Sequence, residues 1–161
     1  MRESDSARGG AHGAVTHANA HPHLDCSGSI AVIHNGIVEN FGNFETRSRR
    51  RAYPFARKQD SSDAHLIEDE RASGARWQEA LERVFARLDG LGAVIVLDLA
   101  SNRYATKRTS PLVVGRNCSK VTIASDEIAR RHATEIHYLE DGEVANVASW
   151  TEFRFRTSPG R

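Results

Sequence analysis

The sequence has few of the residues that would assign it to several large classes of protein. Its 161 residues contain two cysteines, Cys26 and Cys118, which lie too far apart to form a Cys-x-x-Cys pair. A disulfide framework or a cysteine zinc site is therefore not expected, and we interpret both residues as free thiols. No apolar run approaches the ~20 residues of a membrane span, and the start lacks the apolar core of a signal peptide. These absences predict a cytoplasmic protein.

An excess of charge of one sign is also lacking. Lys and Arg number 22, Asp and Glu number 21, and the formal net charge is +1. Such a balance gives no general attraction for nucleic acid or for a membrane surface, so neither is expected as a partner. The hydrophobic content of 39% at this length is enough for one domain with one core. Partners must therefore be recognised at specific sites.

The spacing of apolar residues predicts one strong helix and a series of short strands. Apolar residues at helical spacing predict a helix over about 76–88. The β-branched run 30–34 predicts a buried strand, and the apolar residues within 37–44 predict a short helix after it. Further strands are predicted at 93–99, 104–107, 112–114, 121–124, 135–139 and 143–147, the last two joined as a hairpin. This grouping indicates an α+β fold.

An Asn-Gly pair, Asn35-Gly36, follows the first predicted strand. A side-chain amide beside a free backbone N–H can donate two hydrogen bonds to one oxyanion. Taken alone, however, Asn-Gly is also the commonest sequence of a tight β-turn. The pair therefore leaves two interpretations open, an oxyanion site and a turn.

Histidines are concentrated near the start of the chain, within residues 12–23. Clustered imidazoles can bind a metal ion, but these show no helical pair spacing and no accompanying thiolate or carboxylate pattern. The sequence therefore predicts no metal and no cofactor.

Six segments in order resemble the glutaminase domain of the glutamine–fructose-6-phosphate aminotransferase family. They are Arg-Gly-Gly-Ala-His-Gly (8–13), Asn-Ala-His-Pro-His (19–23), His-Asn-Gly (34–36), Ser-Pro-Leu-Val-Val-Gly (110–115), Ala-Ser-Asp (124–126) and Tyr-Leu-Glu-Asp-Gly-Glu (138–143). The resemblance implies an N-terminal-nucleophile-like α/β/β/α sandwich of antiparallel sheets, incomplete at the N-terminus. It divides the chain into an irregular start (1–7), a partial class II glutamine amidotransferase domain (8–150) and a tail or linker (151–161).

The resemblance assigns Asn35 and Gly36 to the oxyanion hole, which favours that interpretation over the turn. It also implies glutamine contacts for Arg8, at the α-carboxylate, and for Asp60, at the α-ammonium group. Asp60 follows Gly36 by 24 residues, as in the family, although it could equally be a solvated side chain or a helix N-cap. Arg8 could likewise be a solvated arginine.

Two histidines, His12 and His21, fall at motif positions of the family's glutamine site, and the resemblance implies that they help to bind the substrate. The segment after Asp60 departs from the family. It is one residue shorter than the family's Asp-Thr-Glu-Val-Ile-Ala-His and lacks the apolar pair, with Asp63 standing before Ala64-His65. The packing of the following helix is therefore expected to differ.

The family works with an N-terminal cysteine, whereas this chain opens Met1-Arg2-Glu3-Ser4. Cys26 is a poor substitute, since an internal cysteine cannot use its own α-amine as base. We therefore expect a truncated glutaminase domain without the sugar-isomerase domains, inactive as this chain and binding glutamine weakly. The alternative is a non-catalytic glutamine-binding or strand-pairing module that acts with another chain. Exposed sheet edges would favour self-association.

Overall fold

The computed structural model describes residues 21–40, 59–100, 103–126, 131, 133–148 and 153–157. The helices in these ranges are α2 (Gln59–Ala72) and α3 (Trp77–Arg87). One antiparallel sheet has the order β1 (His23–Leu24), β2 (Ile30–Val38), β3 (Gly90–Asp98), β4 (Arg103–Arg108), β8 (Glu143–Val147) and β9 (Phe153–Thr157). A second has the order β6 (Val121–Ala124), β5 (Val113–Arg116) and β7 (Glu135–Tyr138).

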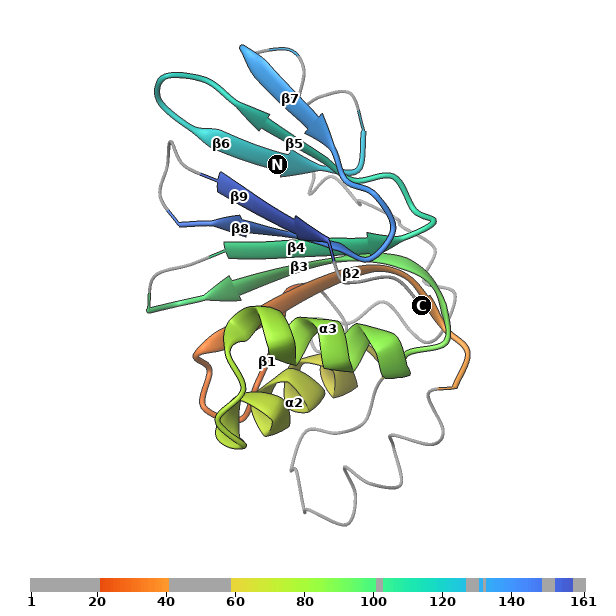
Figure 1. Ribbon diagram of the computed structural model, residues 1–161. Helices are drawn as coiled ribbons and strands as arrows, with labels where there is room; N and C mark the ends of the chain where they lie inside the picture. Colours follow the sequence, from red (N-terminus) through yellow and green to blue (C-terminus); the bar gives the residue numbers. More distant parts are fainter. Residues whose placement is uncertain are drawn as a thin grey trace, which may run out of the picture.

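The six-stranded sheet separates two cores, because successive side chains of a strand point to opposite faces. On one face Val94 and Val96 of β3 belong to a cluster with Leu81 and Val84 of α3. On the other face the clustered residues of β3, β4 and β8 are small and meet the second sheet: Ala93, Ala105 and Ala145. Figure 1 shows the resulting layers, with the two helices on one side of the large sheet and the small sheet on the other. The predicted α+β sandwich with stacked antiparallel sheets is confirmed.

Helix α3 forms where the apolar spacing predicted it. Its buried residues Ala80, Leu81 and Val84 lie on one face, and Trp77 and Phe85 pack beside them. Helix α2 is different, because its residues 63–67 are all buried. A helix buried on several sides gives no clear amphipathic pattern, so its sequence is a weak signal. No helix in the described ranges is long and apolar enough to cross a membrane.

Three local expectations are wrong. Strand β2 continues through Val38, so Ile37 and Val38 are extended rather than helical; the rest of that predicted helix lies outside the described residues. Strands β7 and β8 belong to different sheets, so the turn at 140–142 connects the two sheets and does not close a hairpin. Residues 153–157, expected to be tail or linker, form β9, which pairs with β8 and places Phe155 against the inter-sheet core.

Candidate functional site

Asn35 and Gly36 lie within β2 and not in a turn. Asn35 pairs with Ala93 and Gly36 pairs with Gly92 of β3, so the β-turn interpretation is wrong. The alternation of the strand places the buried His34 on the helix face and Asn35 on the opposite face, where it is exposed. The side-chain amide of Asn35 is therefore directed away from the helices and is accessible in the described part of the chain.

Gly36 is required by the close approach of β2 and β3. A Cβ at this position would lie 2.1 Å from the carbonyl oxygen of Leu91 and 2.4 Å from Cα of Gly92. Both contacts are to backbone, so no side-chain rotation could relieve them. A Cβ at Gly92 would in turn lie 2.5 Å from Nε2 of His34. The glycines therefore allow two backbones and an imidazole to occupy a space that side chains would fill.

A buried pair fixes the residue that precedes Asn35. Nδ1 of His34 lies 2.6 Å from Oδ2 of Asp63 in α2, and the two residues are only 7% and 1% exposed. This contact joins β2, the strand that bears Asn35 and Gly36, to the first turns of α2. Sequence reasoning treated Asp63 as the loss of an apolar contact. The available signal was a carboxylate standing where the family has an apolar residue, together with an unexplained histidine before Asn-Gly.

Asn40 supports the far end of β2. Its Nδ2 donates to the carbonyl of Arg87 at 2.7 Å and to Oδ2 of Asp89 at 3.0 Å, while its Oδ1 accepts from the N–H of Asp89 at 3.1 Å. Arg108 of β4 holds the same region by donating to the carbonyls of Phe85 and Leu88 at 2.9 and 2.6 Å. The strand that bears Asn35 is thus attached to the end of α3.

The structure brings only some of the predicted glutamine-binding residues toward this site. His21 is exposed, and its ring packs edge-on against His23 with 4.6 Å between centroids. Because His23 pairs with Val32 in antiparallel register, residues before His23 run toward the level of His34 and Asn35. The backbone of Asp60 lies in the first turn of α2, one turn before Asp63. Arg8 and His12 lie outside the described residues.

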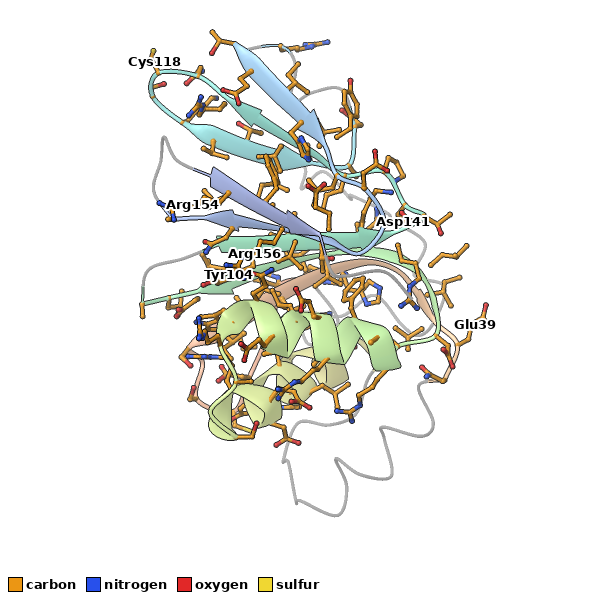
Figure 2. All side chains as sticks on the ribbon, viewed as in Figure 1. Glu39, Tyr104, Cys118, Asp141, Arg154 and Arg156 are labelled. Atoms are coloured by element: carbon orange, nitrogen blue, oxygen red, sulfur yellow. The ribbon has the colours of Figure 1, made fainter. Side chains whose placement is uncertain are left out.

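Cys26 does not have the environment of a nucleophile. It lies in the loop between β1 and β2, and partial burial of its thiol together with the negative charge of Glu68 raises its pKa to about 11. A catalytic thiol needs a pKa lowered toward neutrality. Cys118 is exposed on the loop between β5 and β6, at the end of the small sheet, as Figure 2 shows.

Asp25 organises the loop that contains Cys26. Its Oδ1 accepts the N–H of Ile30 at 2.9 Å, and its Oδ2 accepts the hydroxyls of Ser27 and Ser29 at 2.6 and 3.2 Å. Burial raises the pKa of the Asp25 carboxyl, but these hydrogen bonds together outweigh burial and hold it below its ordinary value. The ionised carboxylate therefore stabilises the folded loop.

Replacing Asp25 with Asn is expected to lower the free energy of unfolding by about 1.5–3 kcal/mol at neutral pH, the range for hydrogen bonds to a charged group. Because the pKa is lower in the folded state, this contribution is full above the unfolded pKa of about 3.9 and is lost as pH falls through the folded value. Urea unfolding of both proteins from neutral to acid pH measures it. The control is Asp98→Asn, because the carboxylate of Asp98 accepts one backbone hydrogen bond, from the N–H of Ala100. A difference that does not shrink in acid would contradict the assignment.

Comparison with known proteins identifies the fold. No protein-family model matches the chain. A glutamine phosphoribosylpyrophosphate amidotransferase from B. subtilis superposes with a TM-score of 0.74 at 20% identity, covering 91% of this chain and 34% of that one. A glutamine aminotransferase class-II domain protein from Silicibacter pomeroyi gives 0.63 at 17% identity, covering 85% and 70%. The fold is that of the N-terminal-nucleophile glutamine amidotransferases.

Sequence relatives narrow the assignment within that class. The glutamine–fructose-6-phosphate aminotransferase [isomerizing] of Treponema pallidum is 38% identical over 140 residues, and that of Pyrococcus horikoshii is 35% identical over 141. These matches cover 84% and 85% of this chain but 22% and 24% of the relatives. The chain belongs to the glutaminase domain of the glutamine–fructose-6-phosphate aminotransferase family, and it spans about a quarter of the length of these relatives.

Proposed function

We propose that this chain forms the glutamine-binding and oxyanion-stabilising part of a glutamine amidotransferase. The observation that supports this most is the position of Asn35-Gly36 in β2, at a close approach of two backbones that only glycine permits. When a nucleophile attacks the side-chain amide of glutamine, negative charge develops on the amide oxygen. Nδ2–H of Asn35 and the N–H of Gly36 are the donors that stabilise this charge.

The amino-acid end of glutamine needs a separate clamp. In this proposal the carboxylate of Asp60 binds the α-ammonium group, Arg8 forms a bidentate pair with the α-carboxylate, and His12 and His21 border the bound substrate. Asp60 lies on the helix that also contains Asp63, so the His34–Asp63 contact sets the distance between clamp and oxyanion site. In a longer protein of this family, the ammonia released would be transferred to fructose 6-phosphate in the cytoplasm.

A second candidate function is a non-catalytic module that binds glutamine or pairs with another chain. The face that bears Asn35 also exposes large apolar side chains in the described residues: Ile33 at 41%, Ile37 at 50% and Leu91 at 55%. Apolar groups gathered on one sheet face favour covering by further strands. Self-association through the sheet edges belongs to this second candidate.

Titration calorimetry of the 161-residue chain tests the glutamine site. Glutamine is expected to bind with a Kd on the order of 1 mM, and fructose 6-phosphate is expected to give no binding heat. Asp60→Ala should remove glutamine binding because the α-ammonium group loses its counter-charge. Asp126→Ala, an exposed carboxylate after β6, is the matched control. Binding of the sugar phosphate, or glutamine binding unchanged by Asp60→Ala, would remove the basis for this site.

A further inference from the structure

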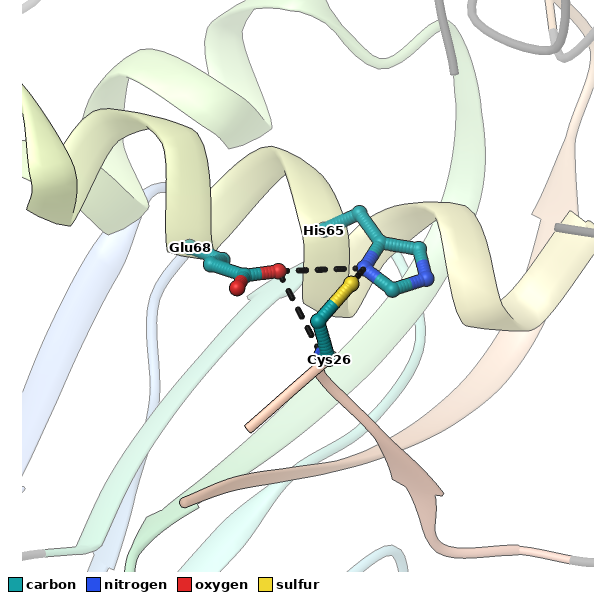
Figure 3. A group of neighbouring side chains, drawn as sticks. All are labelled: Cys26, His65 and Glu68. Carbon is teal, nitrogen blue, oxygen red and sulfur yellow. Dashed lines mark hydrogen bonds and ion pairs between the residues drawn. The ribbon is translucent and has the colours of Figure 1, made fainter. Parts of the chain in front are cut away.

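Three metal-ligating side chains converge outside the proposed glutamine site. Cys26 comes from the loop between β1 and β2, whereas His65 and Glu68 lie one turn apart on α2. Sγ of Cys26 lies 3.6 Å from Nδ1 of His65, and that nitrogen lies 3.2 Å from Oε2 of Glu68. The three donor atoms all lie within 4.8 Å of one another. Figure 3 shows the thiol of Cys26 and the carboxylate of Glu68 both next to Nδ1 of His65, with the same carboxylate accepting the backbone N–H of Cys26 at 3.4 Å.

These distances fit a tetrahedral metal ion. Zinc is bound at about 2.3 Å by sulfur, about 2.0–2.1 Å by a histidine nitrogen and about 2.0–2.2 Å by a carboxylate oxygen. At tetrahedral angles, such bonds place sulfur and nitrogen about 3.5 Å apart and nitrogen and oxygen about 3.3 Å apart. The observed separations of 3.6 and 3.2 Å agree with both values. The third separation, between sulfur and the carboxylate oxygen, is bounded at 4.8 Å, whereas tetrahedral bonds place these atoms about 3.6 Å apart. Binding the ion therefore requires the Cys26 thiol and the Glu68 carboxylate to approach each other by up to about 1.2 Å.

The same geometry argues against a catalytic triad of these residues. In a triad the nucleophile and the acid contact different nitrogens of the imidazole. Here the thiol and the carboxylate both face Nδ1 of His65, while Nε2 is buried. Nδ1 cannot accept the thiol proton while it donates its own hydrogen to the carboxylate of Glu68. Convergence of sulfur, nitrogen and oxygen is instead the arrangement of a coordination site.

We propose that Cys26, His65 and Glu68 form a zinc site, with water as the fourth ligand. The donor set of one thiolate, one imidazole and one carboxylate suits Zn²⁺ and not Mg²⁺ or Ca²⁺, which take oxygen ligands. The loop is prepared for binding because Asp25 fixes its turn, and His65 is held at 3% exposure. The ion would attach this loop to α2, the helix whose Asp63 fixes His34 beside Asn35. The evidence for the zinc site does not depend on the proposed glutamine chemistry, because none of its three ligands is a proposed glutamine-binding residue.

Cobalt provides the test, because Co²⁺ adopts the same geometry and its bond to a thiolate gives a charge-transfer absorption in the near ultraviolet. The full chain, freed of metal with a chelator, is titrated with Co²⁺. One equivalent should produce this absorption together with the visible bands of tetrahedral cobalt, and Zn²⁺ should displace both. Histidines elsewhere in the chain could bind Co²⁺ but would give no thiolate absorption. If no thiolate absorption appears, the proposal is wrong.

Variants identify the ligands. Cys26→Ser should abolish the charge-transfer absorption, and Cys118→Ser, the matched control at the other exposed cysteine, should leave it unchanged. Glu68→Gln should weaken Zn²⁺ binding by about tenfold or more. Zn²⁺ should also raise the thermal midpoint of unfolding of the unmodified chain and of Cys118→Ser. The increase in Glu68→Gln should be much smaller. Absorption that survives Cys26→Ser, or that is lost in Cys118→Ser, would overturn the assignment.

Discussion

With glutamine as the only substrate, the 161-residue polypeptide is expected to release no ammonia above background. The cysteines of this polypeptide are Cys26, whose pKa is raised to about 11, and Cys118, on an exposed loop. Neither resembles the N-terminal cysteine with which the family works. Loss of a nucleophile typically costs about 10³–10⁶ in rate. A coupled glutamate dehydrogenase assay at saturating glutamine measures the release.

The same chain can be given a nucleophile. We expect glutaminase activity when it is fused behind a glutaminase N-terminal segment that begins with a cysteine, the nucleophile that the family resemblance implies. Asn35→Ala in the fusion should lower kcat by about 10²–10³, because one oxyanion donor is lost. Cys26→Ala in the fusion should leave kcat unchanged. If the unfused chain is active and Cys26→Ala abolishes that activity, Cys26 is the nucleophile. A folded fusion that binds glutamine without hydrolysing it would favour the non-catalytic module.

Replacing Asp63 with Ala is expected to lower the free energy of unfolding by about 3–5 kcal/mol, measured by urea unfolding. Asp63 is 1% exposed and lies 2.6 Å from Nδ1 of the buried His34. Removing one member of a buried pair leaves a polar group in the interior, and that is costlier than replacing both. The total stability of a domain is only about 5–15 kcal/mol, so this variant should be close to unfolding.

A double variant distinguishes the contribution of the His34–Asp63 contact from the cost of leaving one buried polar group without its partner. His34→Leu with Asp63→Val replaces the two polar groups by apolar ones of similar size, and we expect it to recover most of the stability lost in Asp63→Ala. Asp63→Asn, which keeps a hydrogen-bond acceptor, should fall between the single and the double variant. A loss of less than about 1 kcal/mol in Asp63→Ala would show that the contact contributes little.

The sequence by itself determined the elements whose signals are local. Helix α3 has one apolar face, and strands β2 to β8 are short runs between turns, so their spacing predicts them, whereas β1 and β9 were not predicted. The ordered motifs were enough to indicate the family, and they predict the oxyanion pair. Asn35 and Gly36 could be named because they are adjacent in the chain.

Only the tertiary structure decided which residues meet. The alternation of one strand cannot show that the turn after Tyr138 crosses between sheets, or that β9 completes the larger one. Asp63 is separated from His34 by 29 positions, and Cys26 from His65 by 39, so no spacing rule connects them. Residues 63–67 are buried on a helix enclosed by several elements, which removes the amphipathic period. These contacts depend on where the sheet places the loop and α2, a property of the whole fold.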